Sequence, residues 1–257
     1  MSAGEGIKVE KKNGVGIIRL NRPEALNILD TDMLRKLATI IGCIEDDKEV
    51  RAAIITGGKN FCAGADVREL SRKNPEEALS FAWLGQGVFD MIEDLGKPVI
   101  AAIMGYALGG GCEMALACDI RIAGESARIG QPEIDLGIIP GFGGTQRLTR
   151  LVGIGKAKEM ILTGRVLEAR EAGAIGLLNQ VVKDEEVMKT AEDLALVMVR
   201  KSPLILGIAK DAINEGQDIK KALETEAAFF SECFKSEDHI EGINSFLEKR
   251  APRFKGT

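Results

Sequence analysis

The stretch GYALGGGCEMALACD, residues 105–119, joins a glycine-rich turn to a short apolar helix and decides the fold. An apolar run, Pro98 to Gly105, precedes the glycines, and another run, Asp119 to Gly124, follows the helix. Short runs rich in β-branched residues and bounded by glycine or proline are typical of buried strands. The segment therefore predicts a strand, a tight turn, a helix over Cys112–Cys118 and a second strand.

The same alternation continues toward the N-terminus of the chain. Further strands are expected at Val15–Leu20 and Ala52–Gly57, and an amphipathic helix is expected at Thr31–Asp47, with Asp30 or Thr31 as its cap. The apolar positions of this helix recur at helical spacing: Leu34, Leu37, Ile40, Ile41 and Ile44. Alternating strands and helices predict an α/β core whose strands run largely side by side.

The pattern changes at about Asp184, where the predicted strands stop. The remaining residues form successive amphipathic helices, interrupted at Pro203, at Gly216 and just before His239. We therefore divide the chain into a core, residues 1–183, and a helical C-terminal region, residues 184–257. The apolar faces of these helices need a covering surface, either the core or a neighbouring subunit, and we expect an oligomer.

Composition narrows the classes of partner. The 257 residues are near the upper size for one hydrophobic core, and 45% are hydrophobic and 28% charged, as in ordinary folded proteins. A net charge of −5 provides no overall positive field for nucleic acid or anionic lipid. The longest uncharged run, Pro98–Cys112, is shorter than the roughly 20 apolar residues of a membrane-spanning helix. We expect neither a nucleic-acid partner nor a membrane.

The cysteines indicate a reducing compartment. Cys43, Cys62, Cys112, Cys118 and Cys233 are odd in number and form no C-x-x-C pair, which argues against disulfides and a zinc site. We expect buried thiols. The first residues have no pattern of a secretory or transit peptide, so a cytoplasmic location is expected.

Several kinds of chemistry have little support in the sequence. The single histidine, His239, lies in a charged helical segment without a nucleophile motif, so we expect it on the surface and outside any catalytic triad. No metal-binding motif is present, and we expect no protein-bound metal. The glycine-rich segments 14–19, 141–147 and 153–158 do not complete a phosphate-binding fingerprint. Carboxylates remain as candidate acids and bases.

Two glutamates lie in unusually apolar surroundings. Glu113 follows the glycines 109–111 in the first turn of the predicted helix, where it either stabilises the positive helix end or acts chemically. Its apolar neighbours predict a desolvated carboxyl with a raised pKa, and the glycines let a ligand oxygen approach the backbone N–H groups. Glu133 follows Pro132 and also enters an apolar segment. Two such carboxylates suit proton removal and delivery at one centre.

Four segments together resemble the crotonase superfamily, and enoyl-CoA hydratase in particular. They are FCAGAD (61–66), the segment at 105–119, QPEIDLGIIPGFGGTQRLTR (131–150) and FLEKR (246–250), and the similarity runs from residue 20 to residue 250. The resemblance implies an α/β, crotonase-like superhelix of repeated ββα units with a helical C-terminal trimerisation region. It also implies a homotrimer or homohexamer (dimer of trimers) and an acyl-CoA thioester as substrate. Coenzyme A is part of that substrate, so no separate cofactor is expected.

The resemblance also assigns roles to individual residues. The backbone N–H groups of Ala65 and Gly110 would form an oxyanion hole, Glu113 would activate water, Glu133 would protonate the substrate, and Gly141 would help to hold the water. Further substrate-binding residues are implied along the coenzyme A path: Ala63, Asp66, Val67 and Arg68. Phe246 and Lys249 would approach the nucleotide of a coenzyme A that an adjacent subunit binds. An ordinary amphipathic helix is the alternative explanation for the last two.

The function implied by the resemblance is reversible hydration of a short-chain trans-2-enoyl-CoA to the (S)-3-hydroxyacyl-CoA. Double-bond isomerisation or another enolate reaction is the first alternative, because it uses the same oxyanion hole. An RNA-binding or scaffold protein on this fold is the second, and the negative net charge weighs against it. The acyl pocket is expected within residues 70–91, where Trp83, Leu84 and Phe89 are candidate lining residues or core residues.

Overall fold

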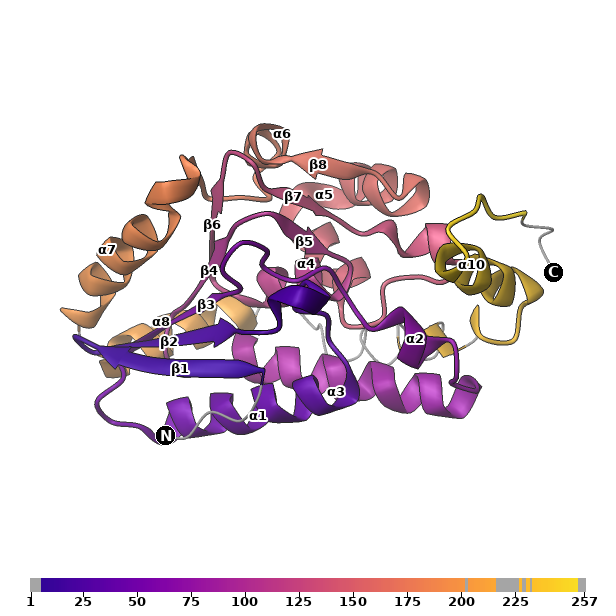
Figure 1. The fold of residues 1–257 in the computed structure, drawn as a ribbon. Coiled ribbons are helices and arrows are strands. Elements are labelled where there is room, and N and C mark those ends of the chain that lie inside the picture. The colour runs from indigo at the N-terminus through magenta and orange to yellow at the C-terminus, as the bar shows by residue number, and fades with distance from the viewer. Residues whose placement is uncertain (1–5, 202, 216–226, 228–229, 232, 254–257) are drawn as a thin grey trace.

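Two β-sheets form the centre of the molecule, with helices around them (Figure 1). The computed structural model describes residues 6–201, 203–215, 227, 230–231 and 233–253. The six-stranded sheet has the order β1-β2-β3-β4-β6-β9, and the three-stranded sheet has the order β5-β7-β8. The strands of the large sheet are β1 Ile7–Lys12, β2 Val15–Leu20, β3 Ala52–Thr56, β4 Val99–Ile103, β6 Ile120–Gly124 and β9 Gln180–Val182. Those of the small sheet are β5 Tyr106–Leu108, β7 Arg128–Gly130 and β8 Val166–Glu168.

Most neighbouring strands run parallel, as the alternation of strands and helices predicts. Only the pairs β1–β2 and β7–β8 are antiparallel among the named strands. Consecutive strands belong to different sheets before the chain enters a helix, as in β4–β5–α4 and in β6–β7 followed by α5. These repeated ββα units confirm the predicted superhelical fold.

The two helices whose bounds were predicted, at 31–47 and 112–118, are found as α1 and α4, shifted by no more than two residues. The α-helices are α1 Thr31–Asp46, α2 Val67–Leu70, α3 Pro75–Glu93, α4 Gly110–Ala117, α5 Gly144–Thr163, α6 Ala169–Ala174, α7 Val187–Val199, α8 Pro203–Glu215 and α10 Glu237–Leu247. Short 3-10 turns are η1 Pro23–Ala25, η2 Pro132–Leu136 and η3 Asp184–Glu186. The side chain of Asp30 accepts a hydrogen bond from the Met33 amide at 2.7 Å, which confirms Asp30 as the cap of α1.

The four inner strands of the large sheet, β2, β3, β4 and β6, are mostly apolar because both faces of the sheet are covered there. The edge strands β1 and β9 are largely exposed or half-buried. In β3, Ala53 and Ile55 enter the main core beneath α1, α3 and α4, whereas Ala52 and Ile54 enter a second core. Helix α7 covers that second core with Val187, Ala191 and Ala195 (Figure 1). The first long helix of the C-terminal region therefore packs on the sheet, and an oligomerisation role for residues 184–257 stays a prediction.

Two predictions about burial are wrong. His239 is only 5% exposed, because α10 turns it inward on the same face as Ile243, and its ring lies 4.0 Å from the Phe234 ring between centroids. Cys43 is exposed, because the inner face of α1 is formed by other positions, and Cys233 is half-buried. Cys62, Cys112 and Cys118 are buried as expected, and burial raises the pKa of the Cys62 and Cys118 thiols to about 12. That pKa shift keeps the two thiols neutral.

Candidate active site

Glu113 lies in the first turn of α4 and is 1% exposed. Its amide donates to the Gly109 carbonyl at 2.9 Å, where Gly109 has a φ of 49° that favours glycine. Its Oε1 accepts hydrogen bonds from the backbone N–H groups of Phe142 and Gly144, both at 2.8 Å. Two main-chain donors stabilise the ionised carboxylate and fix its position inside the protein.

Glu133 approaches the same helix start from η2 and is 8% exposed. The Gln131 side-chain amide, which is fully buried, donates to both oxygens of Glu133 at 2.9 and 3.1 Å in the orientation that satisfies both groups. A Cβ atom added to Gly109 would lie 2.9 Å from Glu133 Oε1. The glycine at this position therefore makes room for the carboxylate.

The two glutamates share one site. A Cβ atom added to Gly144 would lie 2.9 Å from Glu113 Oε1 and 2.6 Å from the side-chain amide of Gln131. Since Gln131 also donates to Glu133, the same buried side-chain amide lies near both carboxylates. Sequence reasoning found both glutamates and missed Gln131, although its place two residues before Glu133 was a usable signal.

The hydrogen bonds on either side of Ala65 direct its N–H group away from Leu29. Leu29 pairs with both neighbours of Ala65: its amide donates to the Gly64 carbonyl at 2.8 Å, and its carbonyl accepts from the Asp66 amide at 2.9 Å. Because backbone groups alternate along an extended segment, the Ala65 N–H points away from Leu29. A Cβ atom on Gly64 would lie 3.8 Å from the Gly110 nitrogen, so the two segments are in contact.

Gly110 is the first residue of α4, and its N–H has no acceptor within the helix. The Gly110 amide and the outward-facing Ala65 amide therefore lie on two touching segments, next to the helix that carries Glu113. Such a pair of main-chain donors suits an oxygen that becomes negatively charged.

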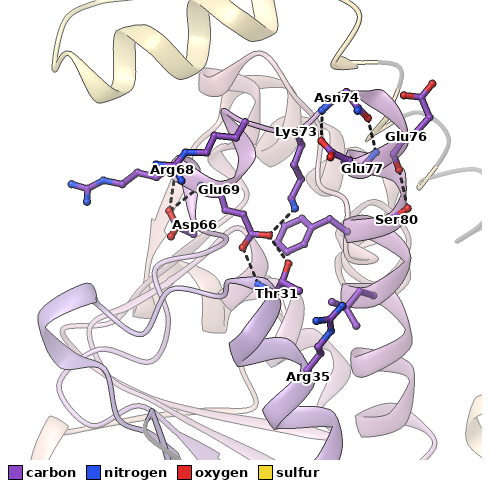
Figure 2. A pocket seen from close by; sticks show the side chains of 13 residues that line it. Thr31, Arg35, Asp66, Arg68, Glu69, Lys73, Asn74, Glu76, Glu77 and Ser80 are labelled. Carbon is purple, nitrogen blue, oxygen red and sulfur yellow. Dashed lines mark hydrogen bonds and ion pairs between the residues drawn. The ribbon is translucent and has the colours of Figure 1, made fainter.

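The residues predicted along the coenzyme A path lie on both sides of Ala65 in the chain. Ala63, Asp66 and Val67 are half-buried and Arg68 is exposed. Asp66 caps α2, because its carboxylate accepts from the Arg68 amide at 2.8 Å. Asp66 and Arg68 line an open groove of about 760 Å³ between the starts of α1, α2 and α3 (Figure 2). Glu113 and Glu133 are not among the residues that line this groove.

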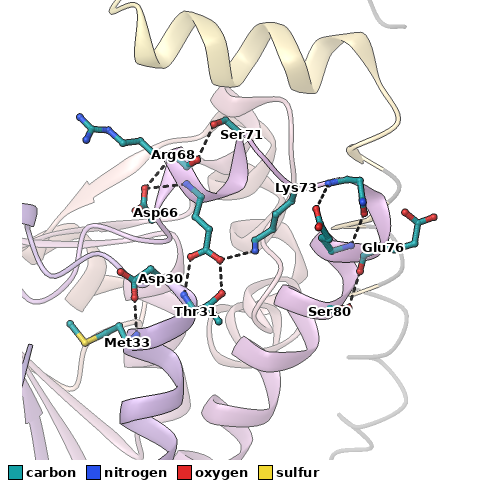
Figure 3. A network of polar contacts seen from close by, with 12 residues as sticks. Asp30, Thr31, Met33, Asp66, Arg68, Ser71, Lys73, Glu76 and Ser80 are labelled. Atoms are coloured by element: carbon teal, nitrogen blue, oxygen red, sulfur yellow. Dashed lines mark hydrogen bonds and ion pairs between the residues drawn. The ribbon is translucent and has the colours of Figure 1, made fainter. Parts of the chain in front are cut away.

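A partly buried network of hydrogen bonds around Glu69, at the side of the groove, fixes the position of α2 (Figure 3). Glu69 accepts from the Thr31 amide at 2.9 Å, from the Thr31 hydroxyl and from Lys73 Nζ at 2.7 Å. Burial raises the pKa of Glu69, but the hydrogen bonds from Lys73 and Thr31 outweigh it and hold the pKa below its ordinary value. This network ties α1 to the segment that carries Ala65, and the spacing of Glu69 and Lys73 was its signal in the sequence.

The structure does not bring the last two predicted residues to the glutamates. Phe246 is 56% exposed near the end of α10, and Lys249 is exposed just after it. Among the candidates for the acyl pocket, Trp83 is 53% exposed and Leu84 lines the groove. Phe89 is fully buried against the Phe142 ring, so core packing accounts for it.

Two further findings concern the described part of the chain. It contains no helix that combines the length and the apolar character needed to cross a membrane. Nor do three or more His, Cys, Asp or Glu side chains gather there in a cluster that would hold a metal ion.

The chain is similar to known proteins of one enzyme family. The enoyl-CoA hydratase/isomerase family model matches residues 10–257. The short-chain-enoyl-CoA hydratase of Clostridium acetobutylicum is 50% identical over 246 residues, 94% of each chain, and the crotonyl-CoA hydratase of Syntrophomonas wolfei is 46% identical over 256 residues, 98% of each chain. The crystal structure of an enoyl-CoA hydratase from Bacillus anthracis is 41% identical, has a TM-score of 0.80, and is matched over 98% of this chain and 100% of that one.

The fold and these similarities define a crotonase-type enzyme that acts on acyl-CoA thioesters. The chain belongs to the enoyl-CoA hydratase/isomerase family, and its activity is that of an enoyl-CoA hydratase.

Proposed function

We propose that the chain adds water reversibly across the double bond of a short-chain trans-2-enoyl-CoA, such as crotonyl-CoA, and forms the (S)-3-hydroxyacyl-CoA. Glu113 and Glu133 are the catalytic pair, and the reaction serves fatty-acid oxidation or a related acyl-CoA pathway. The observation that carries the proposal is the buried pair of carboxylates, one held by two backbone amides and the other by Gln131. Burial on this scale is rare for a glutamate without a chemical task.

The oxyanion hole lowers the barrier to addition. When water oxygen bonds to Cβ, the electron pair of the double bond moves toward the thioester carbonyl, whose oxygen becomes an enolate. The N–H groups of Ala65 and Gly110 stabilise that charge without reorganising. Each such donor contributes about 3 kcal/mol to the transition state.

The two glutamates then move the protons. Glu113, whose Oε1 accepts hydrogen bonds from two main-chain N–H groups, removes a proton from the attacking water, and the N–H of Gly141 helps to hold that water. Glu133 delivers a proton to Cα, which collapses the enolate to the product. Proton exchange through solvent water then removes the proton from Glu113 and restores the one that Glu133 gave up. Water therefore supplies both the hydroxyl group and the net proton, no covalent enzyme intermediate forms, and no metal or separate cofactor is required.

The names of two relatives support a short acyl group. One is a short-chain-enoyl-CoA hydratase and the other a crotonyl-CoA hydratase. The coenzyme A part of the substrate follows Ala63, Asp66, Val67 and Arg68, and Phe246 and Lys249 reach the nucleotide bound by an adjacent subunit.

The exposed apolar residues of two helices support the oligomer that this last contact requires. They lie on α5 and α8, and they are Leu151, Ile154, Ile205, Ile208 and Ile213, between 37% and 74% exposed. Leu151 and Ile213 line the same groove, and grouped exposed apolar side chains are typical of a subunit interface. The proposed assembly is a homotrimer or a homohexamer, located in the cytoplasm, without a nucleic-acid or membrane partner.

Substrate preference tests the proposed reaction. We expect loss of the conjugated thioester absorbance to be fastest with crotonyl-CoA and slower with 2-enoyl-CoA substrates of 10 to 16 carbons. The family also contains isomerases, so a 3-enoyl-CoA is assayed in parallel. Faster turnover of the 3-enoyl-CoA than of crotonyl-CoA would favour an isomerase instead.

A further inference from the structure

One peptide unit, the bond between Gly141 and Phe142, connects α3 to the carboxylate of Glu113. Its N–H end, the Phe142 amide, donates to Glu113 Oε1 at 2.8 Å. Its C=O end, the Gly141 carbonyl, accepts from Gln86 Nε2 at 3.0 Å. Because the peptide group is planar, a side chain that fixes the carbonyl oxygen also fixes the direction of the N–H group.

Gln86 is built into the core for this contact. It lies in α3, is 4% exposed, and reaches a carbonyl 55 residues along the chain. A buried amide costs free energy unless its hydrogen bonds are made, so the contact defines the position of both partners. Gly85, the preceding residue, lets the Phe142 ring lie against the helix, since a Cβ atom there would lie 2.2 Å from the ring.

Other contacts of the loop fix different groups. The Phe142 carbonyl, which belongs to the next peptide unit, accepts from Arg147 at 3.0 Å. The Phe142 ring packs edge-on against Phe81 and Phe89 at 5.2 and 5.7 Å between centroids. These contacts hold the backbone and the ring, whereas Gln86 sets the orientation of the amide that meets Glu113.

We propose that Gln86 is a positioning residue for catalysis, which acts on Glu113 through the Gly141–Phe142 peptide unit. The inference rests on the proposed function, because it requires Glu113 to be the base. Hydrogen bonds in series polarise one another, so the Gln86 donor also strengthens the bond that the Phe142 amide makes to the carboxylate. Gln86 lies within residues 70–91, which contain none of the four segments that resemble the family. The hydrogen bond that orients the Gly141–Phe142 peptide unit therefore comes from outside those segments.

The test uses the full-length protein and the variant Gln86→Met, which keeps length and packing but removes the donor. We expect kcat for crotonyl-CoA to fall roughly tenfold, the effect of about one hydrogen bond, while KM changes less than about twofold. We expect the acidic limb of kcat/KM to move to higher pH, because a more weakly held carboxylate takes up a proton more readily. Gln180→Met, the same change at an exposed position of β9, should alter neither quantity.

A second variant keeps the test decisive if Gln86→Met folds poorly. In Gln86→Glu an ionised carboxylate faces the Gly141 carbonyl oxygen and repels it, whereas the protonated acid donates to it. The difference in kcat/KM between Gln86→Glu and wild type should therefore become smaller as pH falls. For Gln86→Met the same difference should become larger as pH falls. A merely structural role would give both variants the same pH trend and would lower the melting temperature together with kcat, and that result would overturn the inference.

A parallel assay of Glu113→Gln separates the two levels of explanation. If Glu113→Gln loses activity and Gln86→Met retains both wild-type kcat and the wild-type pH profile, the role of Gln86 is refuted and the proposed function stands. If Glu113→Gln retains wild-type turnover, the proposed role of Glu113 as the base is refuted, and the role of Gln86 with it.

Discussion

The buried histidine makes the free energy of unfolding depend on pH, by an amount that follows from its pKa. His239 is 5% exposed, and its Nδ1 has no hydrogen-bond partner among the described residues. Burial lowers the pKa of His239 from 6.5 to about 4. The unfolded chain therefore binds a proton more readily than the native protein, so this contribution to stability is complete above pH 6.5 and is lost as pH falls through 4.

The size of this change in stability follows from the pKa of His239 in the unfolded chain, 6.5, and in the native protein, about 4. Relative to pH 7, His239 lowers the free energy of unfolding by about 2 kcal/mol at pH 5 and by about 3 kcal/mol at pH 4. The variant His239→Phe has no titrating group at this position and keeps a ring against Phe234. We expect wild type to lose stability relative to this variant by those amounts.

Urea unfolding followed by circular dichroism at pH 7, 6, 5 and 4 measures the difference, at one fixed protein concentration because oligomers unfold in a concentration-dependent manner. Other titrating groups affect both proteins alike, so only the difference between the two curves is informative. Parallel curves from pH 7 to pH 4 would refute the burial of a neutral His239.

Two other substitutions test the packing around the site. In Gly242→Ala the new Cβ would lie 2.3 Å from the Leu136 carbonyl, so α10 must move away from η2. We expect a loss of about 3 kcal/mol in thermal unfolding and a lower kcat, because η2 carries Glu133, and an unchanged melting temperature would contradict this. In Glu69→Gln we expect a loss of about 1 kcal/mol at pH 7 from weaker bonds to Lys73. The loss should vanish as pH falls below 4.5 through the lowered pKa of Glu69, whereas a pH-independent loss would refute an ionic role.

The four inner strands of the large sheet were predictable because they are buried on both faces and are mostly apolar, whereas its edge strands β1 and β9 were not predicted. The predicted strand Pro98–Gly105 became β4 Val99–Ile103, since Gly105, with a φ of 56°, turns the chain into the small sheet. The small sheet itself was not predicted. Its strands β5, β7 and β8 have three residues each, too few to show a periodic pattern.

The candidate site was predictable where a charge lies among apolar residues, as with Glu113 and Glu133. The residues that hold these carboxylates in place, such as Gln86 and Gln131, were not predicted. Gln86 bonds to a main-chain carbonyl far along the sequence, and such a partner leaves no trace in the spacing of side chains. The prediction for His239 failed for a related reason, because its contact with Phe234 is set by how α10 packs and not by its charged neighbours in the sequence.

The turnover of crotonyl-CoA by Glu113→Gln and Glu133→Gln tests the central claim most directly. Each change keeps the shape of a buried side chain and removes one acid–base group, so kcat should fall by about 10²- to 10⁴-fold while KM and the melting temperature stay close to wild type. If either variant hydrates crotonyl-CoA within about threefold of the wild-type kcat, far less than the loss of an acid–base group costs, the pair of carboxylates is not the catalytic machinery.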